Sequence, residues 1–331
     1  MASLGEPRPI LMMRIQIRVL NKLRRSILRG RDANNDGPAL PIQHCGQAAS
    51  DLIRKYLLTD APCMIARFGR TELRTILRRW NRRRSGLVLN AWRYVRGNQG
   101  PFWWDDEIKE AIRDLSGFFP CTDDALDRFA DLYLRDFAQT DILGAWCPGE
   151  TALAGHVPRA RILRLQDLEP YYHDDPWTTA LVGRTVLVLH PFEASIRKQY
   201  EKRDVLFANP GVLPEFKLKT LKAVQSLGGN GSGFKSWFDA LDWMCARVRE
   251  IEFDVALIGA GAYGLPLAAF VKGMGKKAVH LGGATQILFG IKGMRWEQRP
   301  FFRDLYNDHW TRPLPEETPK SYLAVESGCY W

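Results

Sequence analysis

One segment in the last third of the chain constrains the fold more than any other. Residues 253–258 form a short run that is apolar apart from Asp254, and Gly259, Gly261 and Gly264 follow it directly. A second apolar run then covers residues 265–273. A strand that leaves through a glycine-rich turn into a helix is typical of parallel α/β sheets, because backbone N–H groups at such a turn can approach a phosphate. We therefore expect a strand at 253–258 and a helix at 265–273.

The same alternation of short apolar runs and helical patterns recurs along the chain. Further strands are expected at 63–66, 141–146, 161–165, 185–190 and 278–281, and helices at 47–58, from about 70, at 124–140, from about 195, at 217–225 and at 234–249. Short connections between strands and helices predict an α/β fold with a doubly wound, mostly parallel, Rossmann-like sheet and helices on both faces.

The first 43 residues differ from the rest in pattern. Residues 10–28 have apolar side chains at helical spacing with most of the basic side chains on the other side, and the apolar positions are Met13, Ile17, Leu20, Leu23 and Ile27. This predicts an N-terminal basic amphipathic helix, which either packs on the domain or anchors residues 10–29 on anionic lipid. Residues 30–43 resemble a linker. We expect one domain from 44 to 331, with halves of about 44–180 and 181–331.

The distribution of charge and of cysteines limits the kinds of partner and the cellular location that we expect. Of the net charge of +10, residues 1–34 hold +6 and residues 64–100 hold +9, which leaves −5 for the remainder. Local basic surfaces indicate anionic partners: phospholipid, nucleic acid or phosphorylated small molecules. There is no uncharged apolar run of about 18 residues, no uninterrupted signal-peptide core and no CxxC pair among the six cysteines. These absences favour a cytoplasmic protein, peripheral on the membrane at most.

Charged and polar side chains follow several of the expected strands. Parallel strands bring their carboxyl ends to one sheet edge, where open α/β sheets bind ligands. The candidate binding residues there are Arg67, Gly69, Arg70 and Thr71 after the first strand, His190 and Ser195 after 185–190, Gly259, Gly261, Tyr263 and Gly264 after 253–258, and Gly282, Gly283, Thr285 and Gln286 after 278–281. Glu72 and Glu193 are the candidate general bases.

Each of these candidates also has a purely structural interpretation. The arginines and Glu72 could form an ion pair inside a loop, His190 could be a satisfied histidine beside a helix cap, and the glycines could form a turn without a ligand. A dinucleotide cofactor is disfavoured because strand 278–281 ends in Gly282 and Gly283, with no Asp or Glu to hold a ribose hydroxyl. No HxH or HxxxH pair suggests a metal site.

The sequence Arg67-Phe68-Gly69-x-x-Glu72 after a short strand resembles the Arg-Phe-Gly-Asp-Gly-Glu signature of the GT-D-fold glycosyltransferases. That superfamily includes the glucosyltransferase domains that extend glycans on bacterial serine-rich adhesins. Residues 255–296 and 326–331 are similar to members found in bacterial surface-polysaccharide gene sets, and the resemblance covers about residues 45–331. It implies a GT-D-type fold, a nucleotide-sugar donor, commonly a UDP-sugar, and a glycan or lipid-linked acceptor.

One departure from the family pattern affects the expected cofactor. Where the family carries an Asp-x-Glu motif that helps to hold a divalent ion, this chain has Arg70-Thr71-Glu72. An arginine can itself neutralise a leaving diphosphate, so no metal is expected and a Mn or Mg requirement is disfavoured. Arg67 and Arg70 would then hold the diphosphate, with Glu72 as general base and Glu193 as second choice.

The sequence thus favours a glycosyltransferase, with two alternatives left open. A nucleic-acid-binding protein could use the arginine-rich residues 64–100, although no RNA- or DNA-binding motif accompanies them and no nucleic-acid partner is expected. A non-catalytic nucleotide-sugar binding protein is the other alternative, because Arg70 departs from the family motif.

Overall fold

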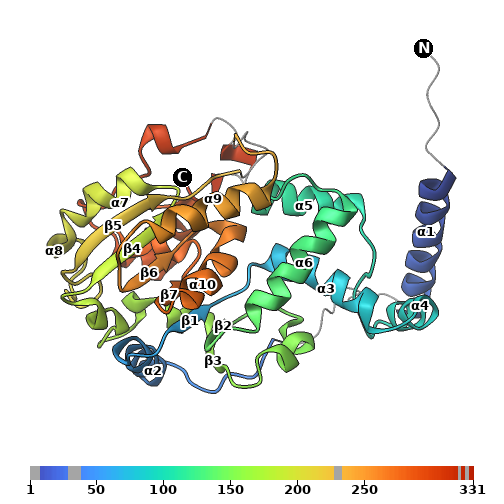
Figure 1. The fold of residues 1–331 in the computed structure, drawn as a ribbon, viewed down its shortest axis with the longest axis horizontal. Helices are drawn as coiled ribbons and strands as arrows, with labels where there is room; N and C mark the ends of the chain where they lie inside the picture. The colour runs from blue at the N-terminus through green and yellow to red at the C-terminus, as the bar shows by residue number, and fades with distance from the viewer. Residues whose placement is uncertain (1–7, 29–38, 227–232, 320–321, 325–327) are drawn as a thin grey trace, which may run out of the picture.

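A computed structural model describes residues 8–28, 39–226, 233–319, 322–324 and 328–331 (Figure 1). Its centre is a seven-stranded parallel sheet in the order β3-β2-β1-β7-β6-β4-β5. The strands are β1 (Cys63–Ala66), β2 (Ile142–Ala145), β3 (Arg161–Arg164), β4 (Thr185–His190), β5 (Lys217–Lys222), β6 (Val255–Ile258) and β7 (Lys277–His280). The fold is the α/β, doubly wound, Rossmann-like sheet expected from the sequence.

Helices cover both faces of the sheet. Their bounds are α1 (Arg8–Leu28), α2 (Gln47–Leu58), α3 (Arg70–Arg84), α4 (Leu87–Val95), α5 (Asp106–Ser116), α6 (Asp123–Phe137), α7 (Glu193–Tyr200), α8 (Arg203–Leu206), α9 (Trp237–Arg249), α10 (Gly264–Gly273), α11 (Ala284–Leu288), α12 (Met294–Glu297) and α13 (Pro300–Leu305). Helices α3, α5, α6, α9 and α10 pack on one face, while α2, α7 and α11 pack on the other.

The two layers of helices explain why the inner strands are apolar along their whole length. Successive strand residues point to opposite faces, so Met64 and Ala66 of β1 join one core while Cys63 and Ile65 join the other. All four are buried. A strand buried on both faces therefore appears in the sequence as a continuous apolar run.

The sequence-based prediction of a helix at residues 217–225 is wrong. Residues Lys217–Lys222 form the edge strand β5, whose pairing with β4 places Lys217 opposite Thr185 and Lys222 opposite His190. Lysine and leucine favour helices, but here Lys217, Lys219 and Lys222 are exposed while Leu218 is half-buried. Lysines on an exposed edge also discourage pairing with another chain.

The order of the strands creates a crevice at the carboxyl edge of the sheet. From β4 the chain runs through α7 to the edge strand β5, whereas from the neighbouring β6 it runs through α10 back to the central strand β7. Connections that leave adjacent strands in opposite directions open a gap between them, and ligands bind there in open α/β sheets.

Ion pairs attach α3 to its neighbours on the same face of the sheet. Arg79 contacts both Asp127 and Asp131 of α6, with oxygen distances of 2.7 and 3.1 Å. Arg82 pairs with Asp127, and Arg83 lies 2.8 Å from Asp131. The basic run in the sequence is thus partly a structural contact between two helices.

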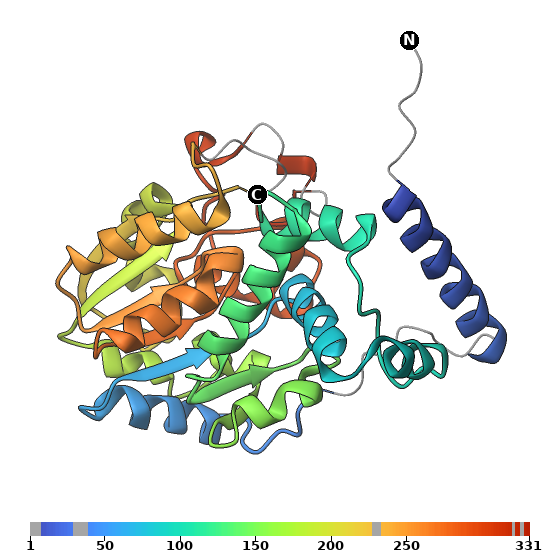
Figure 2. The same ribbon diagram turned by 45° about the vertical axis from the view of Figure 1, so that its right-hand side comes forward.

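Helix α1 confirms the expected N-terminal helix and projects away from the sheet, with α4 beside its C-terminal end (Figure 2). Arg24 is buried, donates to the carbonyl oxygen of Gln99 at 2.9 Å and lies over the ring of Tyr94. Ile17 and Leu20 pack beside it. Within the described ranges, no helix combines the length and apolar character needed to span a bilayer.

The expected linker is only partly described, because residues 29–38 lie outside the described ranges. Beyond them, the chain already belongs to the domain before residue 44. Leu40 is buried, and the N–H of Gln43 donates to the carbonyl oxygen of Ile162 in β3 at 2.8 Å.

Candidate active site

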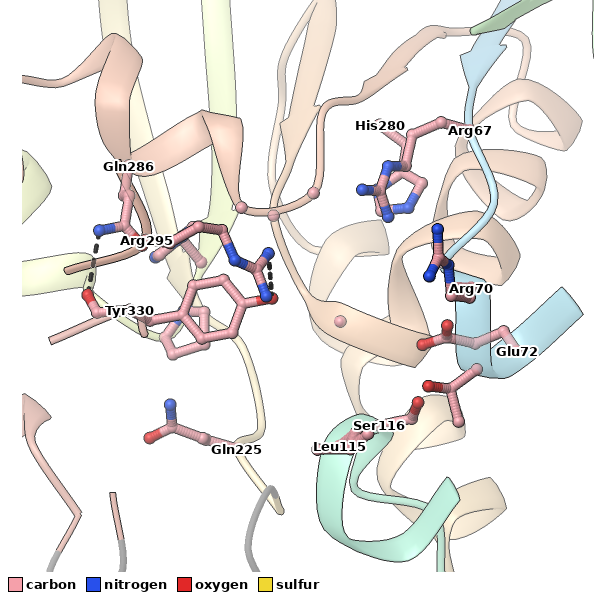
Figure 3. Close-up of a pocket in the computed structure, with 18 of the residues that line it drawn as sticks. Arg67, Arg70, Glu72, Leu115, Ser116, Gln225, His280, Gln286, Arg295 and Tyr330 are labelled. Atoms are coloured by element: carbon pink, nitrogen blue, oxygen red, sulfur yellow. Dashed lines mark hydrogen bonds between the residues drawn. The ribbon is translucent and has the colours of Figure 1, made fainter. Parts of the chain in front are cut away.

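A pocket opens at the carboxyl edge of the sheet, above the ends of β1, β4, β6 and β7 (Figure 3). One wall carries Arg67, Arg70 and Glu72, and the opposite wall carries Arg295 and Tyr330. The predicted residues that line it are Arg67, Gly69, Arg70, Thr71, Glu72, His190, Gly259, Gly261, Gly282, Gly283 and Gln286. Residues that follow different strands and lie far apart in the sequence therefore meet at one edge of the sheet, as expected from the parallel strands.

Two arginines flank one tryptophan in the first wall. The guanidinium carbons of Arg67 and Arg70 lie 5.4 and 5.6 Å from the ring centre of Trp146, which follows β2. The indole Nε1 donates to the carbonyl oxygen of Phe68 at 2.9 Å. The buried carboxylate of Glu150 accepts the backbone N–H of Trp146 at 3.2 Å. The indole is thus held in place and keeps two positive charges close together.

Several buried polar atoms at this edge of the sheet have no protein partner. They are Nε of Arg67, Oγ1 of Thr285 and Oε1 of Gln286. The side chains of Thr285 and Gln286 are fully buried. A buried polar atom without a partner costs about 1–3 kcal/mol, so a ligand or ordered water is needed to satisfy it. The Arg67 guanidinium, which lines the pocket, is suited to an anion.

Glu72 lies at the third position of α3, with Gly69 as N-cap. A Cβ added to Gly69 would lie 1.8 Å from Oε2 of Glu72, so the carboxylate folds back over the N-cap residue. A glutamate at this position can cap its helix by reaching the N-cap N–H. The side chain nevertheless lines the pocket and is 7% exposed. The geometry fits both a cap and a general base.

Two buried histidines lie at the floor of the pocket. Burial lowers the pKa of His190 to about 3, and burial together with the charge of Arg67 lowers the pKa of His280 to about 3. Nδ1 of His190 accepts the N–H of Phe192 at 3.0 Å, whereas Nδ1 of His280 lies 3.2 Å from the carbonyl oxygen of Ile258 and donates to it. Both rings are neutral at pH 7 and add no charge to the pocket.

Two of the three glycines in the glycine-rich turn are explained by packing. A Cβ on Gly259 would lie 2.5 Å from the ring of His190, and a Cβ on Gly264 would lie 2.0 Å from the ring of His280. Gly261, at a φ of 52°, has open space where a Cβ would lie and adopts a left-handed backbone. The expectation that all three approach a phosphate is corrected: Gly264 does not line the pocket.

The second wall comes from the C-terminal part of the chain. Nε2 of Gln286 donates to the carbonyl oxygen of Tyr330 at 3.0 Å. Arg295 donates to the hydroxyl of Tyr330 at 3.2 Å and lies over its ring (Figure 3). Gly283 lies against Tyr330 and leaves no room for a side chain, since a Cβ there would be 2.8 Å from the ring.

The structure does not bring four other predicted residues to the pocket lining. Glu193 accepts the hydroxyl of Thr220 at 2.6 Å, beside β5. The hydroxyl of Ser195 donates to Glu317, and Oγ also accepts the N–H of Leu314 at 3.0 Å. Tyr263 stacks on Trp237 in the core, and Thr285 is fully buried beneath Gly259. Glu193 is therefore not placed to act as the base of this pocket.

Several lining residues were not expected from the sequence: Leu115, Ser116, Tyr133, Trp146, Pro191, Phe192, Gln225, His280, Arg295 and Tyr330. A signal existed for Trp146 and His280, because each lies at the carboxyl end of a correctly predicted strand. No strand end marked Arg295, which lies in the short helix α12, or Tyr330, which lies next to the last residue of the sequence.

The donor set does not suit a divalent metal ion. Within the described part of the chain, Glu72 is the single carboxylate that lines the pocket, and it shares the wall with Arg67 and Arg70. Mn and Mg prefer several oxygen ligands, and two nearby cations repel them. The described residues also contain no cluster of three His, Cys, Asp or Glu side chains suited to a metal.

No protein-family model, curated protein or solved structure matches the chain. Two arginines held on one indole, a helix N-terminus and one carboxylate are suited to hold a phosphorylated group and to take up a proton beside it.

Proposed function

We propose that this protein is a glycosyltransferase that uses a nucleotide-diphosphate sugar, with a UDP-sugar as the first choice, and a glycan or lipid-linked acceptor. The observation that carries the proposal is Arg67. Its half-buried guanidinium has an unpartnered Nε and shares one pocket wall with Arg70 and with a single carboxylate, Glu72, at the carboxyl edge of the sheet. This is the arrangement that departure of a diphosphate and deprotonation of an acceptor hydroxyl would require.

In the proposed reaction, Arg67 and Arg70 bind the diphosphate. The acceptor oxygen forms a bond to the anomeric carbon of the sugar as the bond from that carbon to the diphosphate breaks, and the diphosphate keeps the electron pair. Glu72 takes the proton of the acceptor hydroxyl. The two arginines stabilise the charge that develops on the leaving group without a metal ion.

The arginine-rich segment has a better explanation than nucleic-acid binding. Five of the ten arginines in residues 64–100 form ion pairs with carboxylates on neighbouring elements: Arg74, Arg78, Arg79, Arg82 and Arg83. Tyr94, which could have stacked on a base, is buried against α1. Both observations disfavour the nucleic-acid alternative.

A non-catalytic nucleotide-sugar binding protein remains the second candidate, because Glu72 occupies a capping position. Glu72→Gln separates the two, since glutamine can cap a helix but cannot act as the base. A catalytic Glu72 predicts that turnover falls about 10²–10⁴-fold while donor affinity and thermal stability hold. Unchanged turnover in Glu72→Gln would remove Glu72 as the base.

Calorimetric titration with UDP, and then with other nucleoside diphosphates, tests the donor site directly. Arg67→Ala should weaken binding by about 1.5–3 kcal/mol, the usual contribution of a charge-assisted hydrogen bond. Arg74→Ala is the matched control, because Arg74 pairs with Glu107 at 2.7 Å on the outer part of α3 and does not line the pocket. Absence of binding for every nucleoside diphosphate, or equal loss in both variants, would refute the proposal.

We also propose that α1 places the enzyme on an anionic membrane surface. Its buried side holds Arg24, Ile17 and Leu20, so the sequence-based assignment of a single apolar stripe is corrected. A second stripe remains exposed at four-residue spacing, and its members are Ile15, Val19, Leu23 and Ile27, each about half exposed. Exposed Arg18, Lys22 and Arg25 accompany it. Apolar and basic side chains together favour an anionic lipid surface.

A further inference from the structure

A second hollow, here called the side groove, runs along α3 away from the pocket. It is lined by residues of α3 at spacings of three and four, so it follows one side of that helix from its first residue to its last: Arg70, Arg74, Leu77, Arg78, Asn81 and Arg84. A helix of this length extends about 21 Å. The side groove encloses about 910 Å³, which is within the range of ligand sites.

The side groove connects the pocket with α1. Arg70 lines both hollows, so one end of the side groove adjoins the proposed diphosphate site. The other end is lined by Asn21 of α1 and Tyr94 of α4. A ligand in the side groove would therefore reach from α1 to the reacting centre.

The charges in the side groove are not balanced. Arg74 pairs with Glu107, and Arg78 pairs with Asp105. Glu107 and Asp105 are the two acidic residues among the described residues that line the side groove, so both are already paired. Arg84 and Arg70 form no ion pair with any described carboxylate. Arginines without acidic partners in a hollow favour an anionic ligand, and phosphate oxygens suit the guanidinium fork.

Two buried polar atoms of the lining also lack partners. They are Nε1 of Trp80 and Oε1 of Gln99, and the Gln99 side chain is 6% exposed. One is a donor and the other an acceptor, so a hydroxyl group could satisfy either. Indole rings also provide apolar faces for sugar rings. The wall thus combines features that suit a saccharide with cations that suit a phosphate.

We propose that the side groove binds the acceptor, and that the acceptor is a saccharide joined through phosphate or diphosphate to a lipid chain. The saccharide would lie toward Arg70, the phosphates at Arg84 and the lipid toward α1 and the membrane. The inference rests on the proposed function of the pocket, because it assigns the second substrate of the same reaction.

Calorimetry with farnesyl diphosphate as the probe, in protein saturated with UDP, tests the assignment. We expect binding in the presence of UDP, a loss of about tenfold or more in Arg84→Ala, and no change in Arg83→Ala. Arg83 is the matched control, since it is the preceding residue, is exposed and pairs with Asp131 outside the side groove. Thermal unfolding of both variants confirms that each is folded.

Two ligand controls identify which part of the probe is recognised. Farnesol lacks the phosphates and inorganic diphosphate lacks the lipid, so both should bind more weakly than farnesyl diphosphate. Equal affinity for farnesol would overturn the role of Arg84, and equal affinity for inorganic diphosphate would identify a free-phosphate site instead.

The outcomes also separate this inference from the proposed function. If UDP competes with farnesyl diphosphate, or if Arg84→Ala binds it unchanged, the side groove is not the acceptor site even though the pocket binds a donor. If UDP and all other nucleoside diphosphates fail to bind, the proposed donor site is wrong, whatever the side groove binds.

Discussion

Replacing Gly69 with alanine should disable the pocket by displacing one side chain. The backbone of Gly69 has a φ of −80° and a ψ of 145°, which alanine adopts without strain. The new Cβ would lie 1.8 Å from Oε2 of Glu72, whereas ordinary contact begins near 3.4 Å, so the carboxylate must move by about 1.6 Å. A misplacement of about 1 Å can cost about 10²-fold in rate. We expect turnover to fall by at least that factor.

The chain offers a close control for this substitution. Gly86 is the N-cap of α4, with a φ of −65° and a ψ of 162°, and a Cβ there would meet no atom within 4 Å. Gly86→Ala and Gly69→Ala therefore make the same change at a helix cap, which costs about 1 kcal/mol or less in both. Only Gly69→Ala pushes against Glu72.

The assay is the release of nucleoside diphosphate under saturating donor, with donor affinity measured by calorimetry. Gly69→Ala should match Glu72→Gln in lost turnover while binding the nucleoside diphosphate within a few-fold of the original protein, because Arg67 is untouched. Full turnover in Gly69→Ala would refute the assignment of Glu72, since the carboxylate cannot remain where it lies.

Three further outcomes follow from the structure. Donor binding and turnover should survive EDTA, and loss of activity restored by manganese or magnesium would show that oxygen ligands outside the pocket wall rebuild a metal site. The pKa of His190 and of His280 is lowered to about 3, so between about pH 6.5 and 3 these two side chains take up protons only in the unfolded chain. Their contribution should therefore decrease the free energy of unfolding toward acid pH by up to several kcal/mol. Denaturant unfolding at several pH values should show a flatter dependence in His190→Gln or His280→Gln, and an equal slope would contradict this assignment. The fraction of protein that sediments with anionic vesicles at low salt should fall about tenfold or more in the double variant Val19→Glu, Leu23→Glu. The control Leu58→Glu, which alters an exposed apolar residue on α2, should sediment unchanged. Equal loss in both variants would mean that α1 is not the membrane contact.

The sheet could be predicted because parallel strands buried on both faces are uniformly apolar over their length. Val186, Leu187, Val188 and Leu189 show this in β4. The edge strand β5 was missed because none of its residues is fully buried: they are half-buried or exposed, so the strand lacks the continuous apolar run of the inner strands. Six residues of lysine, leucine and threonine do not distinguish such a strand from a helix.

The pocket was predictable where a functional side chain directly follows a strand. Arg67 directly follows β1, Gly259 directly follows β6, and Gly282 follows β7 after one intervening residue; all three line the pocket. The same rule failed for Ser195, because the first turn of α7 directs it toward Glu317, which arrives from more than a hundred residues later in the chain. Contacts over such distances leave no local pattern in the sequence.

The position of β1 between β2 and β7 has a consequence for the synthesis of the chain on the ribosome. β1 pairs with β2 early, but its other edge stays open until β7, more than two hundred residues later, has been translated. Such late pairing slows folding and leaves an exposed edge that other nascent chains could join. Arg67 at the end of β1 likewise gains its neighbour Gly282 only then. A truncated product that ends before β7 would therefore lack a complete pocket.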